Sequence, residues 1–249
     1  MNSAYHRRVA FRGELGNSTS RELPEESLTI LIPVGSTEQH GPHLPLDTDT
    51  RIATAAAVAV TDELNGRGPD HDQFLIAPAI AYGASGEHEG FAGTISIGTS
   101  VLTSLLVEYG RSACAWARRL VFVNGHGGNV EALRSAVATL RFEGRDAAWC
   151  PCVAEGGDAH AGHTETSVLL HISPADVRTQ DWCRGNSTPL ASLMPQMRQG
   201  GVAAVSEVGV LGDPTTATGA DGARIFVQLV EECLRRVDRW SPRDDGMLR

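Results

Sequence analysis

Short continuous apolar runs alternate along this chain with longer segments of helical periodicity. The runs that we expect to form strands are 28–34, 74–80, 120–123 and 147–153. The segments that we expect to form helices are 50–64, 101–119, 130–143, 165–171 and 221–240. Short runs that are apolar throughout are typical of parallel strands buried on both faces. The alternation, without internal repeats, predicts an α/β fold: a single layered α/β/α domain over 1–249 with a mostly parallel central sheet.

Four segments do not fit this alternation. Residues 1–27 are polar and turn-rich and predict an N-terminal arm or lead-in. Residues 82–99 form a glycine-rich polar stretch, and loops of this length inside compact domains usually carry function. Prolines interrupt 173–201, so we expect no long element there, and 206–213 is a candidate for one more short strand.

Composition and charge restrict the classes of partner. The formal net charge of −9 and the pI of about 5.4 argue against nucleic acid or an anionic membrane surface. No apolar run reaches the roughly 20 residues that span a bilayer, and the first residues lack the apolar core of a signal peptide. We therefore expect a cytoplasmic protein whose partners are small molecules, a peptide or copies of itself.

Cysteine and lysine usage excludes some chemistry. The 5 cysteines are an odd number without CxxC spacing, which favours reduced, buried thiols over disulfides or a zinc knuckle. No lysine occurs anywhere in the sequence. Catalysis through a lysine Schiff base is therefore excluded.

Ionisable side chains gather after several predicted strands. Glu38, His40 and Asp49 follow the first strand, His126 follows the third, and Glu165 follows the fourth after a loop. Because the carboxyl ends of parallel strands meet at one edge of a sheet, these side chains can converge. Carboxylates mixed with imidazoles suit Zn, Mn or Fe(II). More acidic ligands than one ion needs indicate two ions.

Each of these residues also has an ordinary explanation. A histidine such as His43, His88 or His163 is commonly a surface or capping residue, and Asp47 or Asp49 could cap the following helix. The run NGHGGN could be a simple turn or a weak phosphate site, although it lacks the Walker lysine and the GxGxxG spacing. A non-catalytic metal- or nucleotide-binding module therefore stays a competing hypothesis. The shared edge of the sheet favours the metal site.

The runs GSTEQHGPHLPLDTDT, FAGTIS, FVNGHGGN and HAGHTETS resemble the creatininase family of metal-dependent amidohydrolases, in order and over nearly the whole chain. The resemblance implies two divalent ions per subunit, Zn and/or Fe(II), with Mn also compatible. It implies that the first ion is held by Glu38, Asp49 and His126 and the second by His40, Asp49 and Glu165, so that Asp49 bridges them. His160 matches a histidine that assists proton transfer in the family.

Further roles follow from combining this resemblance with the residues. We expect His160 and Glu38 to be the catalytic side chains. Backbone N–H groups of Gly127 and Gly128 could stabilise an oxyanion. The remaining candidates for substrate contact lie in the glycine-rich loop, at Glu87, His88 and Phe91.

The sequence departs from creatininase at three places. Creatininase has a metal-binding glutamate where this chain has Gly128, which is why the second site is assigned to Glu165. The acidic residue that precedes the proton-transfer histidine is replaced by Ala159, with Asp158 one step earlier. The tryptophan loop of creatininase is replaced by 156–158. These differences argue against creatinine as the substrate.

Within the family, the sequence resembles members that hydrolyse a radical-modified precursor peptide. This resemblance implies release of the cross-linked, decarboxylated C-terminal Val-Tyr dipeptide of that peptide. The alternative is an amidohydrolase that acts on a small cyclic amide or a formamide. Family members form closed assemblies, so a homo-oligomer, a hexamer or octamer, is expected by resemblance.

Overall fold

Four parallel strands form the central sheet of the computed structural model, which describes residues 13–23, 28–68 and 72–249. The strands are β1 (Leu28–Val34), β2 (Gln73–Ile76), β3 (Arg119–Asn124) and β4 (Ala147–Pro151). Their order across the sheet is β2-β1-β3-β4, and every neighbouring pair is parallel. The predicted lead-in falls largely outside the described residues, apart from 13–23.

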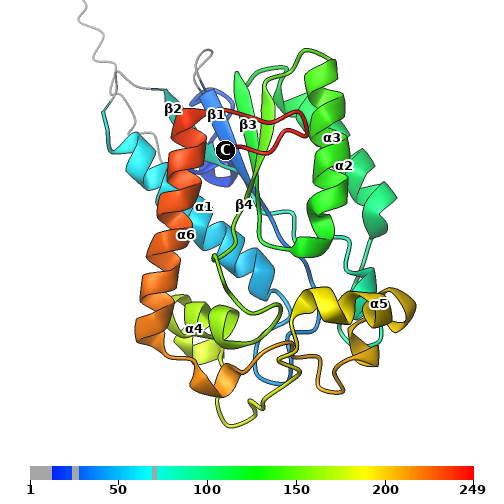
Figure 1. The fold of residues 1–249 in the computed structure, drawn as a ribbon. Helices are drawn as coiled ribbons and strands as arrows, with labels where there is room; N and C mark the ends of the chain where they lie inside the picture. Colours follow the sequence, from blue (N-terminus) through cyan, green and yellow to red (C-terminus); the bar gives the residue numbers. More distant parts are fainter. Residues whose placement is uncertain (1–12, 24–27, 69–71) are drawn as a thin grey trace, which may run out of the picture.

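Helices cover both faces of this sheet (Figure 1). One face carries α1 (Thr48–Asn65), α4 (His163–Ile172) and α6 (Gly219–Arg239). The other face carries α2 (Gly98–Ala113) and α3 (Val130–Phe142). The predicted α/β class with a parallel central sheet is thereby confirmed. One domain over 1–249 stays a prediction.

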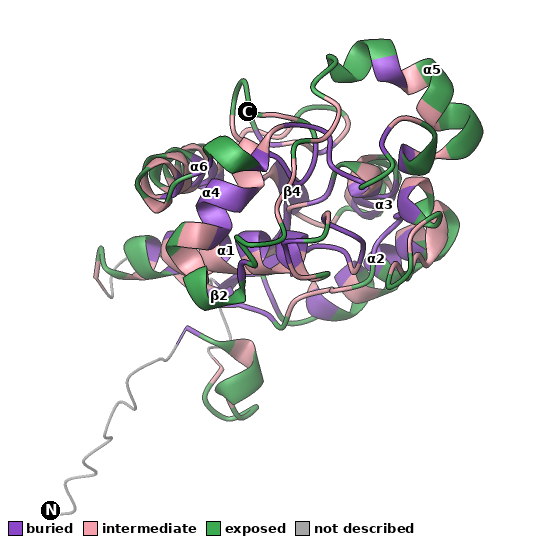
Figure 2. Cartoon of the chain, turned by 90° about the horizontal axis from the view of Figure 1, so that it is seen from below, coloured by how far each residue is buried: buried purple, intermediate pink, exposed green. Residues whose placement is uncertain are grey.

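Alternate residues of the strands enter opposite cores, as the two-residue period of a strand requires. On β1, Leu31 packs into the core under α1, α4 and α6, while Ile30 and Ile32 pack into the core under α2 and α3. On β3, Val121 and Phe122 separate in the same way. Figure 2 shows the buried residues gathered between the helices and the sheet.

Several predicted element boundaries were wrong. The second strand ends at Ile76, short of the predicted residue 80, because the segment that follows contains Pro78, which has no N–H for the strand ladder. The helix predicted over 101–119 ends at Ala113. Arg118 already donates its backbone N–H to Leu28 O at 3.0 Å, so the chain has joined β1 before Arg119 begins β3.

The region after α4 also differs from its prediction. A helix, α5 (Leu190–Gly200), lies where prolines were expected to prevent one, and it contains Pro195. A proline in this position removes the bond to the carbonyl of Ala191, but Ala191 is exposed and water can replace the lost donor. Conversely, 206–213 forms no strand and contributes one antiparallel bridge, between His160 and Leu211.

Short 3-10 helices connect the larger elements. They are η1 (Leu15–Asn17), η2 (Gly86–His88), η3 (Gly127–Asn129), η4 (Pro174–Asp176), η5 (Val202–Ala204) and η6 (Pro214–Thr216). None of the helices in the described ranges is both long and apolar enough to cross a bilayer.

Close approach of backbones fixes the edge of the sheet where the polar clusters lie. Gly35 directly follows β1, and a Cβ at this position would lie 2.3 Å from Thr50 Oγ1 and 2.4 Å from Thr50 Cα. The first turn of α1 therefore sits directly against the end of β1. This contact places the start of α1 beside the loop that carries Glu38 and His40.

We expect Gly35→Ala to lower the free energy of unfolding by about 2 kcal/mol, because the added methyl group overlaps the α1 backbone. Urea denaturation measures the difference. The matched control is Gly86→Ala, where an added Cβ meets nothing within 4 Å. Equal stability of the two variants would contradict the close packing at Gly35.

Candidate metal centre

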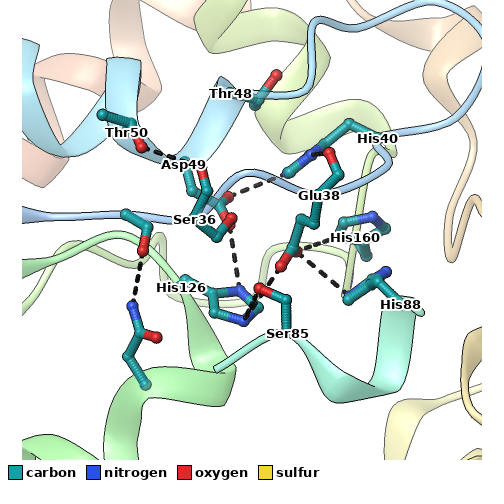
Figure 3. Close-up of polar contacts among 12 residues, drawn as sticks. Ser36, Glu38, His40, Thr48, Asp49, Thr50, Ser85, His88, His126 and His160 are labelled. Atoms are coloured by element: carbon teal, nitrogen blue, oxygen red, sulfur yellow. Dashed lines mark hydrogen bonds and ion pairs between the residues drawn. The ribbon is translucent and has the colours of Figure 1, made fainter. Parts of the chain in front are cut away.

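The structure brings all the predicted metal ligands together at the carboxyl edge of the sheet. Figure 3 shows Glu38, His40, Asp49 and His126 of this set. Glu38 and His40 lie on the loop after β1, and Asp49 lies in the first turn of α1. His126 follows β3, and Glu165 lies in the first turn of α4. All except Glu165, which is half-buried, are buried. The convergence expected from the strand order is therefore present.

His126 lies between two carboxylates. Its Nδ1 is 3.1 Å from Asp49 Oδ2, and its Nε2 is 3.2 Å from Glu38 Oε2. The Nε2 atom is also 3.2 Å from Ala84 O and 3.6 Å from Glu87 Oε1. This imidazole is thus surrounded by oxygen atoms on both sides.

His40 occupies the corresponding position on the other side of Asp49. Its Nε2 lies 3.1 Å from Asp49 Oδ1 and 3.9 Å from Glu165 Oε2. Asp49 therefore contacts one histidine with each of its carboxylate oxygens. Ser36 Oγ donates to Asp49 Oδ2 at 2.7 Å and holds this carboxylate in place. Asp49 is the one residue shared by both predicted ligand sets.

The carboxylates around His40 and His126 favour the protonated, positively charged form of both imidazoles. His40 Nδ1 lies 3.1 Å from Glu38 O, an acceptor, so this nitrogen carries a proton. In a neutral His40 the unprotonated Nε2 would face the carboxylates of Asp49 and Glu165, and its lone pair would be repelled by their oxygens. Burial opposes protonation, but the Asp49 carboxylate outweighs it and raises the pKa of His40 to about 10. For His126 the same balance of burial against Asp49 and Glu38 raises the pKa to about 9.

Glu38 is fully buried, and neither of its carboxylate oxygens has a hydrogen-bond partner. Burial is the main reason that its pKa is raised to about 7, and the neighbouring Asp49 charge adds to this effect. Burial likewise raises the pKa of Glu165 to about 7. Buried carboxylate oxygens without donors are costly in an apolar interior. The donor set, oxygen and imidazole nitrogen around one space, fits divalent transition metals.

Two further histidines complete the cluster. His88 Nε2 lies 3.3 Å and His160 Nδ1 lies 3.9 Å from Glu38 Oε1. Burial lowers the pKa of His88 to about 3 and that of His160 well below its usual range, and nearby histidine charges add to both shifts. These two imidazoles are neutral at pH 7, in contrast to His40 and His126.

Gln39 determines where the protons of His88 and His160 lie. Its Oε1 accepts from Gly41 N at 2.9 Å, which fixes its amide nitrogen as the donor toward His88 Nδ1 at 2.8 Å and Gly209 O at 3.1 Å. His160 Nε2 lies 2.8 Å from Gln39 O and carries the proton of that ring. His160 therefore presents an unprotonated Nδ1 on the side of Glu38.

The backbone around His160 is held from two directions. His160 and Leu211 exchange backbone hydrogen bonds, with Leu211 N donating to His160 O at 2.8 Å. The next residue, Ala161, has a left-handed backbone with φ 51°, which is uncommon for a residue other than glycine. Its N–H donates to Glu165 Oε2 at 2.6 Å. The loop thus couples the positions of His160 and Glu165.

Ligand geometry gives His160 two possible roles. Three groups of side chains place potential ligand atoms within 4.8 Å of one another: Glu38, His40 and Asp49; Glu38, His88 and His160; and His40, His160 and Glu165. The first group combines members of both predicted ligand sets. The other two groups contain His160, for which the resemblance to creatininase implies proton transfer. Metal content of a His160 variant separates these roles.

A cavity of about 480 Å³ opens above the cluster. Asp49, His126, His160 and Glu165 line its floor. Its volume is within the range of small-molecule and peptide-side-chain sites. The cavity therefore gives a substrate access to the candidate metal ligands.

Of the residues predicted to contact a substrate, all but Phe91 line this cavity. Glu87, His88, Gly127 and Gly128 line it. Phe91 is not among the lining residues, and it packs instead against the small cluster of Leu193, Val202 and Leu211. Phe91 thus lies against residues of the cavity wall, and its direct contact with a substrate stays a prediction.

The position of Gly128 explains the departure from the creatininase pattern. A Cβ there would lie 2.2 Å from Ala84 O and 2.5 Å from His126 Nε2. No side chain, glutamate included, fits this backbone without a shift. Glu165, which enters from α4, lies 3.9 Å from His40 and can supply the missing carboxylate.

The remaining acidic and histidine candidates lie outside the centre. Asp47 bonds Arg51 Nε at 2.7 Å, and His43 Nε2 bonds Thr166 Oγ1 at 2.8 Å. His163 Nδ1 bonds Thr216 Oγ1 at 2.9 Å. Asp158 accepts from the backbone N–H of His163 and of Thr164, so it fixes the start of α4 and does not contact His160. His160 is supported by Gln39 and Leu211 in its place.

Two groups of residues at this site were not predicted from the sequence. Gln39 lies between Glu38 and His40, and only its position in the motif could have indicated that it orients other histidines. Residues from the unpredicted α5 also line the cavity. No signal in the sequence pointed to them, because the prolines of this region argued against a helix.

The chain is similar to several known proteins. The creatininase family model, described as creatinine amidohydrolase, matches residues 14–237. The mycofactocin precursor peptide peptidase of Mycobacterium tuberculosis is 70% identical over 250 residues, which cover 100% of both proteins. Two solved structures, a creatininase labelled Mn and a mutant creatininase of Zn-Zn type, are each 24% identical to this chain. Their TM-scores are 0.75 and 0.74, and they cover 92% of this chain and 99% and 98% of their own. At this identity they show the fold alone.

We expect metal binding by the metal-free protein to release protons. With pKa values of about 10 and 9, His40 and His126 are protonated at pH 7, and coordination needs their lone pairs. Zinc affinity should therefore rise with pH up to about pH 9, by at least about tenfold per pH unit. Calorimetry in buffers of different ionisation enthalpy counts the protons. A pH-independent affinity without proton release would contradict this charge state.

We expect Asp49→Ala to remove tightly bound metal and essentially all turnover, because Asp49 contacts both His40 and His126. Metal analysis after gel filtration, followed by an activity assay, measures both losses. The matched control is Asp47→Ala, which removes a carboxylate two residues earlier, at the N-cap of α1; its side chain bonds Arg51 and does not line the cavity. Full metal content in the Asp49 variant would overturn its shared position.

Proposed function

The chain belongs to the creatininase family, and on this premise we propose that it is a metal-dependent peptidase of mycofactocin biosynthesis that hydrolyses the precursor peptide. The family and the 70% identical relative support a hydrolase acting on C–N amide bonds. The observation that carries the proposal is the buried Glu38 carboxylate, which accepts no hydrogen bond and lies against His88, His126 and His160, three histidines that line an open cavity.

We assign two divalent ions to this centre, Zn and/or Fe(II), with Mn also compatible. Glu38, Asp49 and His126 would hold the first ion, and His40, Asp49 and Glu165 the second. When bound, such ions polarise the scissile carbonyl and lower the pKa of a water molecule toward neutrality. The solved relatives named for Mn and for Zn support divalent metals in this fold.

The chain's own residues would perform the proton transfers. His160 keeps its proton on Nε2 through Gln39 O, and its unprotonated Nδ1 lies 3.9 Å from Glu38 Oε1, in a side chain that lines the cavity. Because its low pKa leaves it neutral, Nδ1 can accept a proton from the attacking water and return it to the departing amine. Glu38 Oε1, 3.9 Å from this Nδ1, can share that proton.

Backbone groups can stabilise the charge that develops on the carbonyl oxygen. Gly127 and Gly128 line the cavity at the start of η3, which leads directly into α3. The first N–H groups of a helix lack intrahelical acceptors and point outward from its N-terminus. They are therefore placed to donate to an oxyanion.

Finer features of the function stay predictions. They are release of the cross-linked, decarboxylated C-terminal Val-Tyr dipeptide, a cytoplasmic location, and a homo-oligomer of six or eight subunits. The identity of the relative over its whole length favours the peptide over a small cyclic amide or formamide as substrate.

Incubation of the metal-loaded enzyme with the radical-modified precursor peptide, followed by mass spectrometry, tests the proposal. We expect cleavage of one amide bond and release of a C-terminal dipeptide. His160→Ala should keep its metals and lose about 10²- to 10⁴-fold in rate. An intact peptide at full metal loading would refute the peptidase. Metal loss in the His160 variant would make His160 a ligand.

A further inference from the structure

One face of α5 forms a wall of the cavity. This wall is mainly apolar, whereas the candidate metal ligands on the floor are ionisable. Leu190, Met194, Met197 and Arg198 all line the cavity. Their spacing of i, i+4, i+7 and i+8 places them on one side of a helix. Three apolar side chains and one guanidinium are thus presented by a single element to the same space as the candidate metal ligands.

Apart from this face, α5 packs against the rest of the protein mainly through one side chain. Leu193 is the only residue of the helix that is buried, and it packs with Val202 and Leu211 in a cluster separate from the two main cores. Figure 2 shows α5 at the margin of the fold with most of its surface exposed. Leu190 is 43% exposed although it faces the cavity. The apolar face of this helix is therefore only partly covered by the chain itself.

The charge along the cavity is uneven. Its acidic lining residues are Asp49, Glu87 and Glu165, and Arg198 is the one arginine that lines it. Within the described parts of the chain, the Arg198 guanidinium forms no ion pair or hydrogen bond, whereas Arg51, for example, bonds both Asp47 and Asp176. In a protein with a net charge of −9, an arginine without an acidic partner beside a cavity is available to a ligand.

We propose that α5 selects the substrate of this site, with Arg198 binding a carboxylate of the peptide while Met194 and Met197 contact an apolar or aromatic side chain of it. Guanidinium groups match carboxylates through two parallel hydrogen bonds. Methionine side chains are flexible and make favourable contacts with aromatic rings. This inference rests on the proposed peptidase function, because it assigns parts of a peptide to the walls of that site.

A consequence follows for the anionic part of the substrate. Divalent ions on the cavity floor would attract any carboxylate of the peptide and could hold it in an unproductive position. Arg198, on a different element, offers that carboxylate an alternative partner. Arg198 is therefore a binding residue, and its contribution should be equal in the bound substrate and in the transition state.

Kinetics of Arg198→Gln on the precursor peptide test this role. We expect KM to rise about tenfold or more with kcat changed less than about twofold, since a charge-assisted hydrogen bond is lost from both states. Arg198→Lys should recover only part of the affinity, because an ammonium group cannot make the paired contact. The matched control is Arg239→Gln, which removes an exposed arginine from the last turn of α6, outside the cavity lining. Equal kinetics of the Arg198 and Arg239 variants would overturn the proposal.

Peptide variants identify the carboxylate. Each Asp or Glu of the precursor peptide is replaced in turn by its amide and assayed with the wild-type enzyme and with Arg198→Gln. We expect one replacement to raise KM for the wild type and to have no further effect on the variant, as a double-mutant cycle requires for interacting groups. Additive effects at every position would overturn the assignment of a carboxylate to Arg198.

Met194→Gln and Met194→Leu test the apolar part. The polar replacement should weaken peptide binding about fivefold or more, and the leucine variant should stay within about twofold of the wild type. Equal affinity of both variants and the wild type would contradict the apolar contact.

A binding measurement separates failure of this inference from failure of the proposed function. Calorimetry with the radical-modified precursor peptide and His160→Ala reports affinity without turnover, and Arg198→Gln is added to the same background. If the wild type does not cleave the peptide but Arg198→Gln weakens its binding, the peptidase is refuted and the binding role stands. If the wild type cleaves the peptide and Arg198→Gln leaves the affinity for the peptide unchanged, the inference is refuted and the peptidase stands.

Discussion

The buried contact between Asp49 and two histidines is the interaction on which the rest of the site depends. A carboxylate removed from water is costly unless opposite charge compensates it, and here the compensation comes from His40 and His126 on its two oxygens. Glu38 lies in the same space, with its carboxylate oxygens 3.2 Å from His126 Nε2 and 3.3 Å from His88 Nε2, and accepts no hydrogen bond of good geometry. An arrangement with this much unsatisfied negative charge is stable only with protons or metal cations inside it, so the chemistry of the site follows from its burial.

The fold makes this concentration of charge possible by placing the charged side chains after the ends of strands and in the first turns of helices. The loop after β1 and the loop after β3 leave the sheet side by side because the two strands are parallel neighbours. Gly35 lets the first turn of α1 approach the end of β1, which brings Asp49 beside them. Glu165 enters separately from the first turn of α4. The two hydrophobic cores lie behind this edge and support it without entering it.

The sequence was sufficient for the sheet and for the ligand cluster, because both are expressed in local patterns. Continuous apolar runs identify buried parallel strands, and the position of a polar cluster directly after a strand places it at one edge. The role of α5 could not be predicted, since Pro195 argues against a helix and only exposure of its turns to water permits one. Gln39 was missed for a different reason: its importance lies in contacts with His88 and His160, which are distant in sequence.

Four imidazoles within one cluster are divided by their neighbours into two classes. His40 and His126 contact Asp49 directly, and the carboxylate raises the pKa of each. His88 and His160 do not contact Asp49 and hydrogen-bond to Gln39, so burial, with the nearby histidine charges, lowers the pKa of each. The first class can exchange its protons for metal ions, while the second stays neutral, and His160 within it keeps an unprotonated Nδ1. Gln39, inserted between Glu38 and His40 in the motif, therefore contacts the two neutral imidazoles, while its neighbour His40 contacts a carboxylate.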